Sequence, residues 1–172
     1  MAETNPKDAK TVIYYLLGAI VVLGILGYFA TGKLPFSTNT PTRQEGALKT
    51  VDIKVGEETV NVFVSDTDSA RQTGLARHET LEFGQGMLFI FPEENITPAF
   101  WMKNVNFPID IVWINDGAVT QIDTVQPEPD VSDENLTLYS PGGPIDYVLE
   151  VPANFMFEKG LGVGDPIDLS NL

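Results

Sequence analysis

The sequence predicts a mainly β fold, an antiparallel sandwich or barrel of jelly-roll-like type with one or two short helices, preceded by one N-terminal transmembrane helix. Three observations lead to this prediction. Residues 48–172 hold seven or eight short apolar or alternating segments, separated by turn-forming residues. The helical segments between them are shorter than the crossover helices expected in a parallel sheet. Residues 12–30 are uncharged and long enough for a membrane helix.

The composition divides the chain into four parts. Residues 1–11 are polar, residues 12–30 carry no charge, residues 31–47 are rich in Gly, Pro, Ser and Thr, and residues 48–172 show the periodic patterns. At about 1.5 Å per residue, a helix over the uncharged run nearly crosses a hydrocarbon core of about 30 Å. We therefore predict a cytoplasmic N-terminus, a transmembrane anchor, a flexible linker and a β-rich globular domain, in that order.

Two alternatives exist for the uncharged run, a buried core helix and a cleaved signal peptide. The run is apolar on all sides, unlike most core helices, and it exceeds the apolar region of about 7–15 residues that is usual in signal peptides. An uncleaved anchor is therefore favoured. Lys7 and Lys10 precede the run and Lys33 follows it. This balance favours a cytoplasmic N-terminus, so we expect a single-pass protein of the cell membrane with its C-terminal domain outside the cytoplasm.

The domain begins with a predicted hairpin and a short helix. Val or Ile recurs at every second position over 51–55 and 60–64, which is the period of half-buried strands. Asp66 or Thr67 is suited to cap the helix that follows, because a short polar side chain can accept a hydrogen bond from the first turn. We expect this helix to continue through Ala76.

The middle of the domain holds two strands that are apolar throughout, 87–91 and 111–114, so we expect both of their faces to be covered. Residues 100–103 can form a short strand between them. The Asn-Asp-Gly sequence at 115–117 predicts a hairpin turn, because Asp-Gly tolerates positive φ. Residues 118–125 then return as the second strand of that hairpin.

The last third of the domain contains a loop, a strand and a short helix. Residues 126–134 are acidic and hold two prolines, which predicts an exposed loop. Residues 145–151 are strand-like, and residues 153–159 can form one or two helical turns ended by Gly160. A turn and a strand over 162–169 close the domain.

The composition argues against several classes of function. The net charge of the chain is −14, and residues 49–172 contain 21 acidic and 6 basic residues, so a nucleic-acid partner is not expected. There is no Cys and one His, His78, which excludes disulfides, thiol catalysis and zinc sites built from several Cys or His ligands. No phosphate-binding glycine loop or catalytic serine motif is present. We expect no metal and no cofactor.

The candidate ligand-binding residues are basic, aromatic or polar, and they lie in one region of motifs: Arg71, Arg77, Trp101, Lys103, Asn104 and Asp110. Three of the domain's six basic residues are among them. In so acidic a domain, these three are either paired with carboxylates or available for an anion. In the structural alternative, Arg71 and Arg77 pair with nearby acids, and Lys103 or an arginine pairs with Asp110 or Glu150. Such pairs often fix strand ends and loops.

Separate motifs occur in an order that resembles one known family. They are Arg71-x-x-Gly74-Leu75-x-Arg77, Gly86-Met87-Leu88-Phe89-x-Phe91, Phe100-Trp101-Met102-Lys103-Asn104, Pro108-Ile109-Asp110, Tyr139, Val148-Leu149-Glu150-Val151-Pro152 and Gly160 to Asp165. Over about 49–169, the chain resembles the domain of unknown function 192 family. The resemblance implies a small, mostly β domain of sandwich or jelly-roll type, often behind a signal or anchor segment, with no established activity.

Three functions remain open at this point. The first is a membrane-anchored extracytoplasmic domain that binds a small polar or anionic ligand, or acts as an accessory module. The second is a hydrolase or lyase that uses Asp110 or Glu150 as base, with Lys103 or Arg71 stabilising charge. The third is a purely structural or protein-interaction module. Whether the protein is an enzyme is left open by the sequence.

Overall fold

The computed structural model describes residues 48–172. The predicted N-terminus, anchor and linker, over 1–11, 12–30 and 31–47, lie outside the described residues. No helix within 48–172 has the length and the apolar character needed to span a bilayer.

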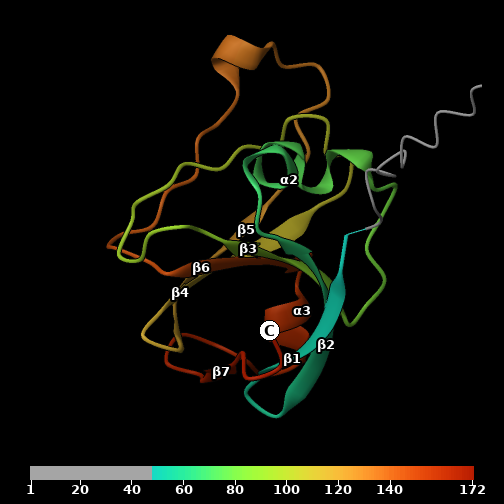
Figure 1. Cartoon of the computed structure of the whole chain (residues 1–172). Helices are drawn as coiled ribbons and strands as arrows, with labels where there is room; N and C mark the ends of the chain where they lie inside the picture. Colours follow the sequence, from blue (N-terminus) through green and yellow to red (C-terminus); the bar gives the residue numbers. More distant parts are fainter. Residues whose placement is uncertain (1–47) are drawn as a thin grey trace, which may run out of the picture. The chain divides into compact units, whose positions relative to one another are not determined.

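The domain is built on one sheet of seven strands (Figure 1). The strands are β1 (Thr50–Val55), β2 (Glu58–Ser65), β3 (Gln85–Ile90), β4 (Ile109–Asn115), β5 (Ala118–Val125), β6 (Tyr147–Pro152) and β7 (Ile167–Asp168). Their order across the sheet is β5-β4-β6-β3-β2-β1-β7. An isolated bridge between Ala118 and Pro166 joins the two edges, so the sheet curls into a nearly closed barrel. The mainly β prediction is confirmed, in its barrel form.

One strand pair departs from the antiparallel prediction. β2 and β3 are parallel, while the other neighbouring strands of the sheet are antiparallel. The expectation that a parallel pair needs a longer helix was wrong here. A parallel pair requires a crossover connection of about a dozen residues or more, which need not be one long helix. The connection 66–84 between β2 and β3 is long enough.

The connection between β2 and β3 begins with the helix that the sequence predicts. The α2 helix (Asp68–Thr73) starts after Thr67, whose Oγ1 accepts a hydrogen bond from the Ala70 N–H at 3.2 Å. Gly74, with φ of 48°, ends it in a conformation that favours glycine. A 3₁₀ turn, η1 (Gly74–Arg77), then continues the chain. The N-cap prediction is confirmed, and the helical segment is split in two.

The inside of the barrel is one apolar core. Alternate residues of the strands point inward, and α3 (Phe155–Glu158) adds two buried side chains from within the curve of the sheet (Figure 1). The fully or almost fully buried members are Val51, Ile53, Val55, Val60, Val62, Val64, Leu88, Val112, Ile114, Val119, Leu149, Val151, Phe155, Met156 and Ile167. The regular alternation seen in the sequence of β1 and β2 is explained by this inward face.

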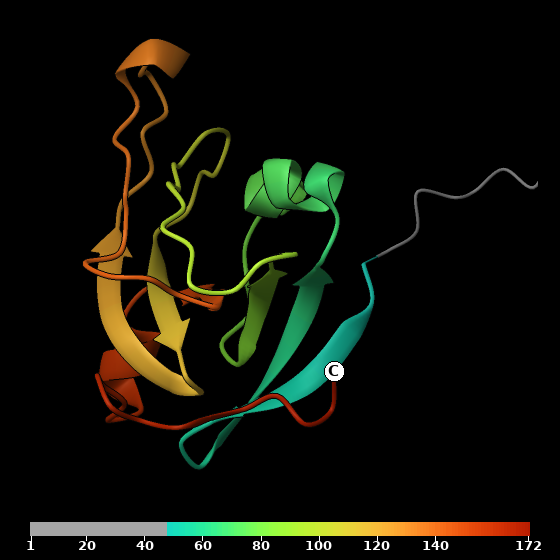
Figure 2. The ribbon, with the colours of Figure 1, turned by 60° about the vertical axis from the view of Figure 1, so that its left-hand side comes forward.

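A second apolar cluster lies on the outer face of the sheet. Met87, Phe89, Ile111, Trp113 and Val148 form its sheet side. Side chains from η1 and from the connections beside the strands cover them: Leu75, Leu81, Met102, Val105 and Ile145. In Figure 2, α2, the β3–β4 loop and the β5–β6 loop lie toward the same end of the barrel. The two faces of β3 and β4 are thus both covered, as their apolar sequences predict.

Among the remaining elements, one turn agrees with the prediction and two segments differ from it. The hairpin turn is confirmed, because Asp116 and Gly117 have φ of 49° and 71° between β4 and β5. Residues 100–103 form only an isolated bridge, between Phe100 and Tyr139. A 3₁₀ turn, η2 (Asp133–Asn135), lies in the predicted acidic loop region. These differences all fall in the segments between strands.

Candidate functional site

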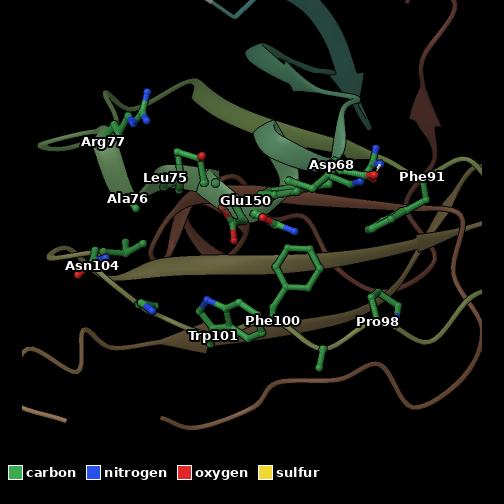
Figure 3. Close-up of a pocket in the computed structure, with 18 residues that line it drawn as sticks. Asp68, Leu75, Ala76, Arg77, Phe91, Pro98, Phe100, Trp101, Asn104 and Glu150 are labelled. Carbon is green, nitrogen blue, oxygen red and sulfur yellow. Dashed lines mark hydrogen bonds and ion pairs between the residues drawn. The ribbon is translucent and has the colours of Figure 1, made fainter. Parts of the chain in front are cut away.

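A cavity of about 790 Å³ opens on the outer face of the sheet (Figure 3). One wall is the α2–η1 segment, and another is the loop 98–105. Its lining residues are Asp68, Arg71, Gln72, Thr73, Gly74, Leu75, Ala76, Arg77, Phe89, Phe91, Pro98, Ala99, Phe100, Trp101, Lys103, Asn104, Val105 and Glu150. The cavity is therefore built from motifs that are far apart in the sequence.

The structure brings five of the six candidate residues to this cavity. They are Arg71, Arg77, Trp101, Lys103 and Asn104. The sixth, Asp110, does not line it. The geometry thus groups the scarce basic residues with an exposed tryptophan and an amide, and ligand binding by these residues stays a prediction.

Arg71 is held in place at one side of the cavity. Its side chain is 15% exposed, and it donates one hydrogen bond to the Ile90 carbonyl oxygen at 2.6 Å. The other terminal nitrogen pairs with Asp68, one helical turn earlier. The guanidinium also lies 5.9 Å from the centre of the Phe91 ring. Arg71 therefore ties α2 to the end of β3, which agrees with the structural alternative for this residue.

The other two basic residues have looser surroundings. Lys103 Nζ lies 2.5 Å from Asp133 Oδ2 in η2, and its side chain is 44% exposed. Arg77 is exposed at the end of η1 and forms no ion pair within residues 48–172. An exposed pair such as Lys103–Asp133 contributes about 1 kcal/mol or less, so a ligand can compete for the lysine.

Aromatic rings form the wall opposite η1. Phe100 packs edge-on against Phe89 and Trp113, with ring centres 4.9 and 5.6 Å apart. Trp101, the next residue, is 46% exposed beside the cavity. Trp113 is instead fully buried in the outer cluster, and its indole N–H donates to Asp123 Oδ2 at 2.6 Å. The two tryptophans therefore have different roles, one in the core and one at the site.

Asn104 occupies a turn at the mouth of the cavity. Its φ of 60° lies in the left-handed region, which Asn adopts more readily than most residues. The residue is exposed, so its amide can face a ligand as well as solvent. At this position Asn104 serves as a turn residue, and its side chain is free to act as an amide donor to a ligand.

Glu150 contributes a carboxyl group to the cavity. The residue is only 5% exposed, and its Oε2 atom has no hydrogen-bond partner among the described residues. Burial raises its pKa to about 8, because the charged form loses its hydration. Sequence reasoning named Glu150 as a possible base or ion-pair partner, but did not include it among the ligand-binding residues. The available signal was a carboxylate in an otherwise apolar strand, β6.

Asp110 has a structural role on the other side of the sheet. In the backbone pairing of β4 with β6, Asp110 lies opposite Val151, and Ile111 lies opposite Glu150. The two acids are therefore one position apart along neighbouring strands. Because successive side chains point to opposite faces, they lie on opposite sides of the sheet. Asp110 accepts hydrogen bonds from Thr124 Oγ1 (2.6 Å) and from the backbone N–H groups of residues 154 and 156 (3.1 and 3.2 Å). It anchors the start of α3 in the barrel.

This placement separates the two acids that the enzyme alternative names as candidate bases. Asp110 and Glu150 do not form a carboxylate pair, because the sheet lies between them. Within 48–172, no cluster of three or more His, Asp or Glu residues is arranged to hold a metal ion. His78 lies with its ring 4.8 Å from the Phe63 ring, and partial burial lowers its pKa. It does not line the cavity.

A comparison with family models is consistent with the arrangement of motifs. The model of domain of unknown function 192, described as "Uncharacterized ACR", matches residues 50–169. The chain belongs to the DUF192 family. The resemblance inferred from the motifs is thus confirmed, and the matched residues include every residue that lines the cavity.

Solved structures with the same fold extend over nearly all of this DUF192 domain. A protein from Sinorhizobium meliloti, described as a candidate transcription regulator, shares 24% identity with a TM-score of 0.65, over 74% of this chain and 99% of the other. A protein of unknown function from Novosphingobium aromaticivorans shares 23% identity with a TM-score of 0.64, over 73% and 89%. These likenesses show the fold alone. No curated protein sequence matches the chain.

Proposed function

We propose that the domain binds a small anionic or polar ligand in the cavity between η1 and the loop 98–105. The observation that carries this proposal is the gathering of Arg71, Arg77 and Lys103 around one concavity. They are three of six basic residues in a domain with 21 acidic ones. The other three basic residues, Lys49, Lys54 and Lys159, do not line the cavity, so the gathering of positive charge at the cavity favours an anion there.

The lining offers each part of a binding site for a small molecule. Arg77 has a planar guanidinium with no ion-pair partner within 48–172, suited to a carboxylate or phosphate. Trp101 and Phe100 provide apolar surface, and Asn104 provides an amide. A few polar groups among apolar and aromatic walls are typical of ligand pockets. This combination favours binding over a purely structural role for the motif.

A thermal-shift experiment tests the proposal with defined anions. Full-length protein is heated with D-glucuronate, succinate or inorganic phosphate. A ligand at ten times its Kd stabilises the folded state by about 1.4 kcal/mol, which raises Tm by about 5 °C. The variant Arg77→Ala should lose this shift. Lys54→Ala, which removes an exposed lysine of β1 outside the cavity, should keep it. Equal shifts in both variants, or no shift with any anion, would contradict the proposal.

We also propose that residues 12–30 anchor the protein in the cell membrane, with the domain outside the cytoplasm. The support is the uncharged run itself and the basic residues before it. In membrane fractions, the full chain should remain after a high-salt wash, whereas a chain starting at Lys49 should be released. External protease on intact cells should digest the domain. Protection of the domain in intact cells would contradict the orientation.

An enzyme is the second candidate function, and one observation favours it. Glu150 is a buried carboxyl with a pKa of about 8 inside a cavity, which is a common environment for a general acid. In this version of the hydrolase or lyase alternative, Glu150 acts without Asp110, and Arg71 or Lys103 stabilises developing charge. Turnover of a carboxylate-bearing sugar or ester that is lost in Glu150→Gln would support the enzyme.

A further inference from the structure

The carboxyl group of Glu150 stands out among the buried polar groups of the domain. Its backbone lies in the middle of the sheet, opposite Met87 of β3 and Ile111 of β4. Its side chain is on the outer face and lines the cavity near its centre in Figure 3. Asp110, the other deeply buried acid, has three hydrogen-bond donors, whereas Glu150 Oε2 has none among the described residues. A buried polar atom without a partner is destabilising, so it calls for an explanation.

We propose that the carboxyl group of Glu150 remains protonated in the cavity and donates a hydrogen bond to an oxygen atom of the bound ligand. This inference rests on the proposed function and specifies the ligand further. The ligand carries an oxygen acceptor, such as a carboxylate or carbonyl group, at the depth of Glu150. A ligand that presents an ammonium group there is disfavoured, because a cation is stabilised by the charged carboxylate much more than by the neutral acid.

The groups around Glu150 favour the neutral acid. Its strand neighbours Met87 and Ile111 carry no charge. The cavity is lined by four other charged residues, Asp68, Arg71, Arg77 and Lys103. Arg71 pairs with Asp68 and Lys103 pairs with Asp133. Within residues 48–172, no ion pair joins Glu150 to either of them or to Arg77. Without a cation beside it, a buried carboxyl loses less free energy when it keeps its proton.

A bound anion would strengthen this protonation. A negative oxygen at hydrogen-bond distance from Glu150 disfavours the carboxylate and favours the acid. A hydrogen bond from a neutral acid to a carboxylate is charge-assisted and stronger than one between neutral groups. The basic residues at the cavity and the acidic donor at its base therefore act in the same direction, toward binding an anion.

The two tryptophan indole groups allow a direct test in the full-length protein. With ¹⁵N-labelled tryptophan, Trp101 reports on the cavity, and buried Trp113, bonded to Asp123, reports on the fold. D-glucuronate, D-glucose and D-glucosamine share a sugar ring and differ in charge. We expect D-glucuronate to shift the Trp101 signal most at pH 6.5, and charged D-glucosamine to shift it least.

The dependence on pH distinguishes a proton donor from a bystander. If Glu150 must be protonated, the affinity for D-glucuronate falls about tenfold between pH 7 and pH 9, as the proton is lost. Glu150→Gln keeps a neutral donor, so its affinity should be up to about threefold weaker at pH 7 and constant up to pH 9. Glu158→Gln, an exposed acid of α3, should retain the wild-type dependence.

Each outcome has a separate meaning. No Trp101 shift with any sugar, together with no thermal shift from succinate or phosphate, overturns the proposed function and the donor role with it. Binding of D-glucuronate that is independent of pH, with an unchanged affinity in Glu150→Gln, leaves the proposed function and overturns the donor role. Preferred binding of D-glucosamine that is lost in Glu150→Gln also overturns the donor role, because the ligand would then be bound by the charged carboxylate of Glu150. An unchanged Trp113 signal in the variants shows that they are folded.

Discussion

The replacement Glu150→Gln should stabilise the protein at high pH and have little effect at low pH. In the folded state, burial raises the pKa of Glu150 from 4.5 to about 8. Between these two pH values, the unfolded chain has released the proton and the folded chain has kept it. Stability therefore falls as pH rises through this window, by about 1.4 kcal/mol per pH unit. Over the whole window, the cost reaches about 5 kcal/mol.

The glutamine variant removes this cost, because it resembles the protonated acid in shape and never ionises. Urea denaturation of both proteins at pH 5, 6, 7 and 8 measures the difference. The free energy of unfolding should be nearly equal at pH 5, and the variant should be more stable by about 3 kcal/mol or more at pH 8. Other titrating groups, such as His78, are shared, so they cancel. Parallel stability curves across this range would refute the raised pKa of Glu150.

Three further predictions concern packing. Asp110→Ala leaves three donors unpaired near the start of α3, and urea denaturation should show a loss of about 3 kcal/mol. Gly86→Ala places a Cβ atom 2.8 Å from the Glu150 carbonyl oxygen. The free energy of unfolding, measured by thermal denaturation, should therefore fall by about 2 kcal/mol. Trp113→Ala should cost about 4 kcal/mol in urea denaturation, whereas Trp101→Ala should cost less than about 1 kcal/mol and weaken D-glucuronate binding. A larger loss from Trp101→Ala than from Trp113→Ala would contradict the assignment of core and site.

The local features of the fold could be predicted from the sequence. The alternation of Val and Ile residues in β1 and β2 is a direct consequence of one buried face. Thr67 caps α2 because its hydroxyl can reach the first turn. The Asp116–Gly117 turn follows from the tolerance of both residues for positive φ. Each of these depends on a few neighbouring residues, which is why the pattern was sufficient.

The features that depend on strand order could not be predicted in this way. The parallel pairing of β2 with β3 is set by where the whole sheet places them, and no local pattern encodes it. The register of β4 against β6 decides that Asp110 faces the barrel interior and Glu150 faces the cavity. From the sequence, both were acids among apolar neighbours. The motifs predicted the region that lines the cavity, and only the sheet geometry separated Glu150, which faces the cavity, from Asp110, which does not.

A crystal structure of the protein with D-glucuronate would test the central claim most directly. We predict a sugar acid in the cavity beside Trp101, with its carboxylate facing Arg77 or Lys103. One oxygen of this carboxylate should also lie within about 3 Å of the Glu150 carboxyl group. An empty cavity with the sugar bound at another surface would contradict the claim. So would a sugar in the cavity whose carboxylate points away from the basic residues.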